Sequence, residues 1–261
     1  MHVKPKKRLG QNFLTDRNIQ NKILRSCAIQ PSDLILEIGP GRGELTSLIA
    51  KEAKRLYAVE LDKDLYQYLK ALFSSQGNVK LINKDILDFD INKYFKRSSS
   101  KIKVIGNIPY YISSPILEKL INSRGKISRI FLTVQKEFAD RLVARPGSSN
   151  FSSFACFIQY YLEPEIIFSI KKNSFYPAPK VDSSFLSLLV REEPAVKVKD
   201  EGVFFKLIRS SFNKRRKTLR NSLRDIVPLE KLERFFREYS INKNTRPQEL
   251  TLQNFADLAN L

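Results

Sequence analysis

A glycine-rich turn is the first feature of the sequence with the residue types of a ligand site. It follows an apolar run at Leu34–Ile38 and holds Gly39, Gly41 and Gly43 at alternate positions. Glycine lets the backbone turn tightly and lets a ligand approach closely, and a helix that starts directly after the turn leaves N–H groups unpaired. One such turn is weak evidence, because many loops contain one. The GxGxG spacing differs from the GxGxxG of dinucleotide enzymes, which favours a ligand without a pyrophosphate.

Two acids follow the next two apolar runs. Glu60 lies about twenty residues beyond the glycines, where an acid can accept hydrogen bonds from both hydroxyls of a ribose. Asp85 follows the run Val79–Ile82, where a carboxylate can meet an adenine amino group while Ile86 lies on the ring. Each acid alone would also suit a helix cap or a solvated carboxylate. Three signals at three successive strand ends predict one shared crevice, because a doubly wound sheet aligns those ends.

A motif with an amide, a proline and an aromatic ring follows the fourth run, Ile102–Ile105. It contains Asn107, Ile108, Pro109 and Tyr110. Proline fixes the backbone here, which places the Asn107 amide and the Tyr110 ring at the same crevice. The motif therefore adds a side-chain amide and a ring to the predicted site.

The elements that position these residues alternate between short strands and amphipathic helices. Strand candidates are Leu34–Ile38, Leu56–Val59, Val79–Ile82, Ile102–Ile105 and Ile130–Val134. Helical spacing occurs at Glu44–Ala53, Leu65–Phe73, Pro115–Ile121 and Lys136–Val143. This alternation predicts a parallel sheet covered on both faces, which is a Rossmann-like α/β domain.

The pattern changes after residue 145. Residues 151–162 have an aromatic-rich helical pattern, and residues 166–170 and 185–190 alternate like strands at a late edge of the sheet, where antiparallel pairing is one option. Four short helical patterns follow at 204–212, 217–226, 229–239 and 252–258. We expect an α/β domain over residues 1–191 with a basic N-terminal segment at 1–25, a connector at 192–202, and a small basic helical domain at 203–261.

Positive charge is concentrated in two segments. Residues 1–25 hold seven Lys and Arg against one acid, and residues 203–246 hold thirteen against four, so these segments carry +15 of the net charge of +19. Concentrated positive charge attracts polyanions, which makes nucleic acid the first partner to consider and an anionic membrane surface the second. Solvated lysine faces on a generally basic protein are the alternative.

Composition excludes several other classes of protein. A chain of 261 residues with 42% hydrophobic content can bury a core, so a stapled mini-protein and a disordered tail are excluded. The sequence contains two distant cysteines and one histidine, His2, which leaves no zinc cluster, catalytic triad or Cys-His pair. We expect no metal. The absence of a long apolar run or of a leader pattern predicts a soluble, cytoplasmic protein.

Together these motifs resemble the ribosomal RNA adenine dimethyltransferases over nearly the whole chain. The Asn-Ile-Pro-Tyr run is similar to the catalytic motif of adenine-N6 methyltransferases. The other matching segments are RLGQNFL at 8–14, the glycine turn, Glu60, Asp85, VQKE at 134–137, FYPAPKV at 175–181 and FNKRRK at 212–217. Tyr111 stands where many members have Asn, and Ile108 where most have Leu.

The resemblance implies a Rossmann-like methyltransferase sheet, a small C-terminal all-helical domain, and roles for individual residues. S-adenosylmethionine would be bound by Gln11, Asn12, Leu14, Gly39, Gly41, Glu60, Leu61, Asp85, Ile86 and Asn107. The Asn107 side-chain oxygen and the Ile108 carbonyl would accept hydrogen bonds from the target amino group, beside Pro109. Tyr110 and Phe175 would stack on the two faces of the base. The RNA would be contacted by Lys214, Arg215, Arg216, Lys217, Arg220 and Arg224, on one side of a C-terminal helix.

The resemblance also implies a substrate: two adjacent adenosines in the 3′-terminal hairpin of 16S rRNA, within the immature 30S subunit, modified by a monomer. A methyltransferase of 23S rRNA of the macrolide-resistance type is the alternative enzyme. A non-catalytic ribosome-assembly factor is the alternative of another class, but such a protein needs none of Glu60, Asp85, Asn107, Pro109 and Tyr110. DNA binding by the basic helices would leave this ordered site unexplained.

Overall fold

The chain divides into two compact units. The structure is a computed structural model that describes residues 4–214 and 217–261. One unit contains Met1–Ala139 and Glu165–Val190, and the other contains Asp140–Pro164 and Arg191–Leu261. The predicted division at residue 191 therefore differs from the structure, because residues 140–164 belong to the C-terminal unit and residues 192–202 are part of it.

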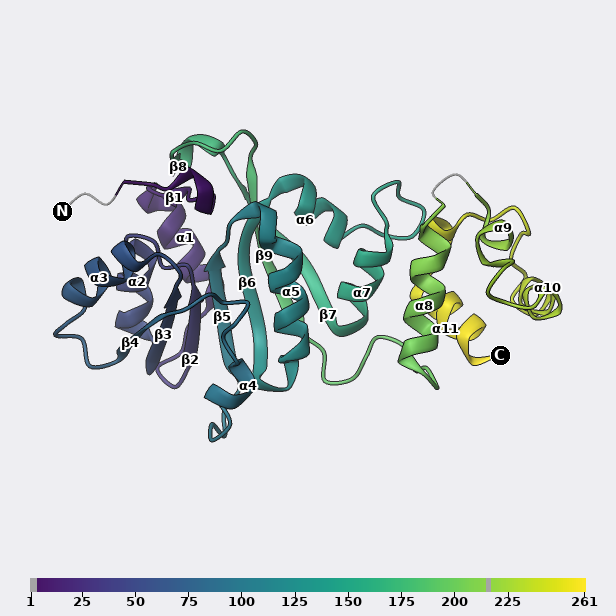
Figure 1. Ribbon diagram of the computed structural model, residues 1–261, viewed down its shortest axis with the longest axis horizontal. Helices are drawn as coiled ribbons and strands as arrows, with labels where there is room; N and C mark the ends of the chain where they lie inside the picture. Colours follow the sequence, from purple (N-terminus) through teal and green to yellow (C-terminus); the bar gives the residue numbers. More distant parts are fainter. Residues whose placement is uncertain (1–3, 215–216) are drawn as a thin grey trace. The chain divides into compact units, whose positions relative to one another are not determined.

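A seven-stranded sheet forms the first unit, in the order β4-β3-β2-β5-β6-β9-β7 (Figure 1). Its strands are β2 Leu34–Ile38, β3 Arg55–Glu60, β4 Val79–Asn83, β5 Ile102–Asn107, β6 Ile127–Gln135, β7 Leu162–Ile170 and β9 Ser183–Val190. The pairs β2–β3, β2–β5, β3–β4 and β5–β6 are parallel, whereas β9 pairs antiparallel with β6. The predicted Rossmann-like sheet is confirmed, and of the options left open for its late edge the structure has antiparallel pairing at β9.

The helices of the first unit flank this sheet (Figure 1). They are α1 Arg17–Cys27, α2 Glu44–Glu52, α3 Lys63–Leu72, α4 Ile91–Tyr94 and α5 Ser113–Asn122, with α6 Lys136–Leu142 reaching into the second unit. Short 3₁₀ turns occur at η1 Lys7–Leu9, η2 Tyr110–Ile112, η3 Arg124–Lys126 and η4 Lys172–Ser174. The helices α1 and α3 are capped by Asp16 and Asp62, whose carboxylates accept hydrogen bonds from backbone N–H groups of the first turn. The sequence pattern did not predict α1.

A two-stranded ribbon joins segments that are far apart in sequence. In it β1 Phe13–Leu14 pairs antiparallel with β8 Phe175–Tyr176, with Leu14 opposite Phe175. Leu14 and Phe175 are buried in an apolar cluster that also includes Ile23 of α1 and Phe185 of β9. The ribbon therefore fixes the N-terminal segment to the core of the first unit.

The second unit is helical. Its helices are α7 Ser153–Tyr161, α8 Glu201–Phe212, α9 Leu219–Leu223, α10 Leu229–Glu238 and α11 Leu252–Asn260, with a 3₁₀ turn η5 Pro247–Glu249. Phe204, Phe235 and Phe255 are fully buried in it. The Glu201 carboxylate accepts hydrogen bonds from the hydroxyls of Tyr160 and Tyr161, at 3.1 and 2.6 Å, which joins α8 to α7. No helix among the described residues has the length and apolar character to cross a membrane.

Candidate active site

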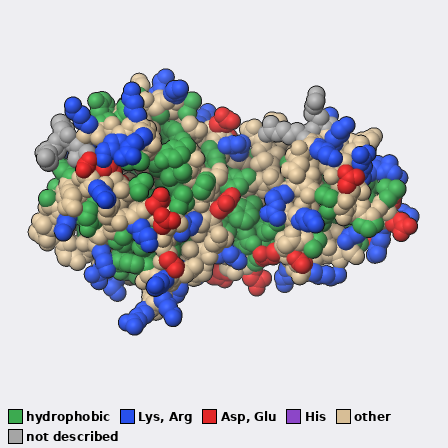
Figure 2. Space-filling view, viewed as in Figure 1, with side chains coloured by type: hydrophobic (Ala, Val, Ile, Leu, Met, Phe, Trp, Pro, Cys, Tyr) green, Lys and Arg blue, Asp and Glu red, His purple; other side chains and the backbone are tan. Residues whose placement is uncertain are grey.

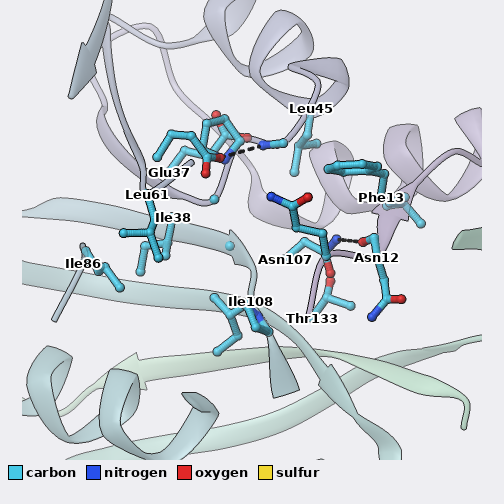
Figure 3. Close-up of a pocket in the computed structure, with 18 of the residues that line it drawn as sticks. Asn12, Phe13, Glu37, Ile38, Leu45, Leu61, Ile86, Asn107, Ile108 and Thr133 are labelled. Atoms are coloured by element: carbon cyan, nitrogen blue, oxygen red, sulfur yellow. Dashed lines mark hydrogen bonds between the residues drawn. The ribbon is translucent and has the colours of Figure 1, made fainter. Parts of the chain in front are cut away.

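The carboxyl ends of β2, β3, β4 and β5 open into one pocket of the first unit. All ten residues predicted to bind the cofactor line it, together with Ile108, Pro109 and Tyr110. Figure 3 shows Ile38, Leu61 and Ile86 on the side opposite to Asn12 and Phe13. The structure therefore brings together strand ends that lie far apart in sequence.

The glycine turn forms the floor between β2 and α2. Gly39, Gly41 and Gly43 have φ angles of +66°, +60° and +84°, a region that side chains other than glycine rarely adopt. A Cβ atom on Gly41 would lie 3.1 Å from Cδ1 of Phe13, so the N-terminal segment packs directly on the turn. The Arg42 guanidinium lies 4.6 Å from the centroid of the same Phe13 ring.

Glu60 is held rigidly at the end of β3. Its Oε1 accepts a hydrogen bond from the Asp62 backbone N–H at 2.8 Å, and its Oε2 one from the Gly41 N–H at 3.4 Å. Burial raises the pKa of Glu60 to about 7, although these backbone donors favour the ionised form. The carboxylate retains lone pairs that a ribose can use, because each oxygen can accept more than one hydrogen bond.

Glu37 is a pocket residue that the sequence analysis did not select. It lies two residues before Gly39, on β2, and its side chain is buried. Its Oε2 atom has no hydrogen-bond partner among the described residues. Burial raises the pKa of Glu37 to about 8; the Thr46 hydroxyl opposes this shift, and the nearby Glu60 and Glu44 carboxylates add to it. Its position inside an apolar strand, next to the glycine turn, was the available signal.

Asp85 and its neighbours line the pocket beyond β4. The Asp85 Oδ1 atom accepts a hydrogen bond from the Leu87 N–H at 2.8 Å, which orients the carboxylate. Ile86 is buried, whereas Leu61 is 46% exposed although it lines the same pocket. Contact with an apolar ring face would remove the exposed surface of this leucine from water, which is favourable.

Asn107 is oriented by the N-terminal segment. Its Nδ2 donates a hydrogen bond to the Asn12 carbonyl at 2.9 Å (Figure 3). Because the amide nitrogen is used in this way, the Oδ1 atom remains to accept a hydrogen bond from a ligand. A Cβ atom on the preceding Gly106 would lie 3.1 Å from Ile108 Cγ2, so the strand end packs tightly beneath the motif.

Two tyrosines follow Pro109 and differ in their surroundings. The Tyr110 hydroxyl is 2.6 Å from Ser183 Oγ of β9, and Ser183 is fully buried. Burial raises the pKa of Tyr110 above its usual value, so the phenol stays neutral. Tyr111 is 63% exposed and packs against Gly10 of the N-terminal segment. The sequence did not indicate the partnership with Ser183.

Phe175, which is predicted to stack on the base, lies beside the pocket-lining N-terminal segment and not in the pocket lining itself. Its side chain is 4% exposed and packs in the apolar cluster with Leu14, and it is not among the residues that line the pocket. The cause is the pairing of β1 with β8, which turns this ring into the core. Stacking by Phe175 would require this packing to change.

Two of the predicted RNA-contacting residues, Arg215 and Arg216, fall outside the described residues, and the others lie in the second unit. The other four do not lie along one helix: Lys214 and Lys217 precede α9, Arg220 lies within it, and Arg224 caps its end. The helix predicted over residues 217–226 is present as α9 but is shorter, because it starts after the Thr218 cap and ends at Leu223.

Acids of the same unit partly neutralise these cations. Lys214 and Arg224 lie 3.9 and 3.4 Å from Asp225, and Arg220 lies 3.1 Å from Glu233. Figure 2 shows Lys and Arg side chains over the helices of this unit, with acids among them.

The pocket suits a nucleoside that carries positive charge. Glu60 and Asp85 provide acceptors for hydroxyl and amino groups, and Ile38, Leu61 and Ile86 provide apolar walls for a flat ring. The unpaired Glu37 oxygen fits a ligand with an ammonium group or another hydrogen-bond donor. S-adenosylmethionine has all of these features. Among the described residues, no group of three or more His, Cys, Asp or Glu side chains could hold a metal ion.

A sheet with this strand order, and with these acids at the ends of its strands, defines an S-adenosylmethionine-dependent methyltransferase. Comparison with known proteins identifies the kind. The family model described as ribosomal RNA adenine dimethylase matches residues 2–261, and the chain belongs to that family. It is therefore an RNA adenine methyltransferase that uses S-adenosylmethionine.

Similar proteins agree with this assignment. The chain is 42% identical to Ribosomal RNA small subunit methyltransferase A of Lachnoclostridium phytofermentans and 40% identical to that of Geobacillus sp., over 98% of this chain and 90% of each relative. A dimethyladenosine transferase structure from Plasmodium falciparum matches with a TM-score of 0.80 at 26% identity, covering 94% of this chain and 95% of that one. The 23S rRNA methyltransferase ErmE matches with a TM-score of 0.76 at 24% identity, covering 96% and 100%, and shows the shared fold.

Proposed function

We propose that this protein dimethylates the N6 amino groups of two adjacent adenosines in the 3′-terminal hairpin of 16S rRNA, in the immature 30S subunit. The relatives named for the small ribosomal subunit support this substrate, because their similarity extends over nearly the whole chain. The 23S rRNA methyltransferase ErmE has a lower identity of 24% and supports only the fold.

The observation that carries the chemistry is the orientation of Asn107. An adenine amino nitrogen is a poor nucleophile because its lone pair is delocalised into the ring. With Nδ2 bonded to the Asn12 carbonyl, the Asn107 oxygen can accept a hydrogen bond from the amino group. A second acceptor, the Ile108 carbonyl, would draw the nitrogen towards tetrahedral geometry and expose the lone pair. S-adenosylmethionine, when bound, supplies a methyl group on a good leaving group.

The rest of the site positions the base. The target adenine must leave its stack, which costs a few kcal/mol, and stacking on an aromatic ring offsets about 1–3 kcal/mol of this. Tyr110 lines the pocket and is fixed by Ser183, so its ring is a preorganised surface for the base. Phe175 could supply the second face only if the β1–β8 ribbon were rearranged on RNA binding.

The second unit supplies contacts to the phosphate backbone. We infer that Lys214, Arg215, Arg216, Lys217, Arg220 and Arg224 bind rRNA phosphates, and that the enzyme acts as a monomer in the cytoplasm. The Arg220 and Arg224 side chains are 44% and 68% exposed, which supports this role. Binding through these cations is expected to weaken steeply as salt is raised.

Methyl transfer to isolated ribosomal subunits tests the proposal. Cofactor with a labelled methyl group is incubated with 30S and 50S subunits from a strain that lacks the modification, and the labelled nucleotides are located by mass spectrometry. We expect N6,N6-dimethyladenosine at two adjacent positions near the 3′ end of 16S rRNA, formed at least about 100-fold more slowly with Asn107→Ala. Label in 23S rRNA would reject the substrate, and monomethylation only would reject the proposed product.

A further inference from the structure

The N-terminal segment, residues 4–14, lines the cofactor pocket with its residues 9–14, although it is not part of the large sheet. Its Gln11, Asn12 and Leu14 line the pocket together with Glu60 and residues from the other strand ends. Leu14 is fixed by its pairing with Phe175, but residues 4–12 precede any strand. The contacts that hold this first part of the segment therefore decide whether the pocket is closed.

Lys6 makes two ion pairs with the start of α3. Its Nζ lies 2.6 Å from Asp62 Oδ1 and 2.7 Å from Asp64 Oδ2. The Lys6 side chain is 30% exposed, the Asp62 side chain is fully buried, and Asp64 is largely exposed. A charge-assisted hydrogen bond to a buried carboxylate is stronger than a surface ion pair.

Gln11 completes the same network. Its Nε2 donates to Asp62 Oδ2 at 3.0 Å, and its Oε1 accepts from the Lys6 backbone N–H at 2.7 Å. Both carboxylate oxygens of Asp62 therefore bind the N-terminal segment. Burial alone would raise the pKa of Asp62, but the hydrogen bonds from Lys6 and Gln11 lower it, so the carboxyl is ionised at neutral pH.

Asp62 also contacts the acid predicted to bind the ribose. Its backbone N–H donates to Glu60 Oε1 at 2.8 Å. Asp62 thus contacts the N-terminal segment through its side chain and Glu60 through its backbone N–H. This arrangement connects closure of the segment with the part of the pocket that holds the cofactor.

We propose that Lys6 is a positioning residue that latches the N-terminal segment over the bound cofactor and thereby sets the rate of cofactor release. Each methyl transfer consumes one cofactor molecule, so a dimethylase must release the spent cofactor between successive transfers. The latch must then open once per transfer. This role does not depend on which ribosomal RNA is methylated.

Release of the spent cofactor tests the latch directly. S-adenosylhomocysteine is bound to the full-length protein and its dissociation rate is measured by rapid mixing with excess competitor. We expect Lys6→Met to raise the dissociation rate by roughly 10- to 100-fold, the range typical of a lost hydrogen bond between charged groups. Lys7→Met is the matched control, because Lys7 is the exposed neighbouring residue and should leave the rate unchanged.

Further variants separate a latch from a general loss of stability. Asp64→Asn removes only the exposed partner and should raise the dissociation rate by about 2- to 5-fold. Asp62→Asn keeps a helix-capping side chain but removes the charge, and its effect should not add to that of Lys6→Met. Hydrogen exchange should increase in residues 4–12 of Lys6→Met and stay unchanged in the sheet strands.

Three results would overturn the proposal. They are an unchanged dissociation rate in Lys6→Met, an equal increase in Lys7→Met, and additive effects of Lys6→Met and Asp62→Asn. Should Lys6→Met fail to fold, Asp62→Asn decides the question, since it removes the charge of the buried partner and an unchanged dissociation rate in that variant would also reject the latch.

Discussion

The two halves of the pocket present different kinds of side chain to a ligand. The half formed by the ends of β2, β3 and β4 contains the carboxylates of Glu37, Glu60 and Asp85, and we call it the acidic half. The half formed by the end of β5 contains Asn107 and Tyr110, and we call it the neutral half. Acids suit a ligand with positive charge and hydroxyl donors, whereas an amide and a phenol suit a neutral base.

This difference predicts that only one half responds to pH near neutrality. Burial raises the pKa of Glu60 to about 7 and that of Glu37 to about 8, so the charge of the acidic half changes within the physiological range. Asn107 does not ionise, and burial raises the pKa of Tyr110 above its usual value. Cofactor binding should therefore be sensitive to pH, and the positioning of the base should not.

Removal of the Asn107 amide should have the largest effect, and most of that effect should fall on the methyl-transfer step. Asn107→Ala deletes an acceptor aimed at the reacting nitrogen, and loss of one preorganised polar group of this kind costs about 100- to 1000-fold in rate. We expect this loss in the single-turnover rate of methyl transfer, with binding to the ribosomal subunit unchanged. Methyl transfer at the wild-type rate would reject the role of Asn107.

Asn107→Asp is the informative companion to this variant. Asp keeps an acceptor oxygen but cannot donate to the Asn12 carbonyl, which Asn107 does at 2.9 Å. If orientation by Asn12 matters, this variant should also be slow; if it is as fast as wild type, the acceptor alone is sufficient and the hydrogen bond to Asn12 has no role in catalysis.

Neutralisation of Glu60 should have the next largest effect and should be confined to the acidic half. Glu60→Gln keeps the shape but weakens hydrogen bonds from hydroxyl donors, and bonds to a charged group contribute about 1.5–3 kcal/mol. We therefore expect cofactor affinity, measured by calorimetry, to fall by roughly 10- to 100-fold. The rate from the fully bound complex should change little, and a large loss in that rate would show that the two halves are not separable.

The pH dependence of cofactor affinity should follow from the same residue. The pKa of Glu60 in the free protein is about 7, and a ribose that binds the ionised form lowers it. Protonation therefore competes with binding as pH falls below 7, and affinity should drop by up to about tenfold for each pH unit. That contribution is half present at pH 7 and nearly complete about one pH unit higher. Glu60→Gln should flatten this dependence, and an unchanged slope in the variant would assign it to another group, with Glu37 the first to test.

The strand ends could be predicted from sequence because each signal is local. A run such as Leu34–Ile38 ends in glycines, and the parallel sheet then places Gly39, Glu60 and Asp85 around one pocket. The periodicity of the apolar residues predicts the strands, and the parallel topology brings the carboxyl ends of these strands to one edge of the sheet. Glu37 was within the same motif, but its unpaired oxygen becomes visible only when the packing around it is known.

The features that were missed depend on contacts between distant segments. Phe175 is buried because β1 pairs with β8, and no local pattern at residues 13–14 indicates a strand of two residues. The same holds for the bond of Tyr110 to Ser183 and for the ion pairs of Lys6. The domain boundary predicted at residue 191 differs from the structure for a related reason. Helix α7 packs with α8 through Glu201, so residues 140–164 belong to the C-terminal unit although the connector pattern in the sequence lies later, at 192–202.

The smallest expected effect concerns the hydrogen bond that fixes Tyr110 in the neutral half. Tyr110→Phe keeps the stacking ring but leaves the buried Ser183 hydroxyl without its 2.6 Å partner, which should lower the free energy of unfolding by about 1–3 kcal/mol. Methyl transfer should slow only a few-fold and cofactor affinity should stay the same. Tyr110→Phe combined with Ser183→Ala should recover most of the stability, because no unpaired hydroxyl remains. Chemical unfolding of the two single variants and the double variant measures this, and additive losses in the double variant would mean that the hydroxyls do not brace each other.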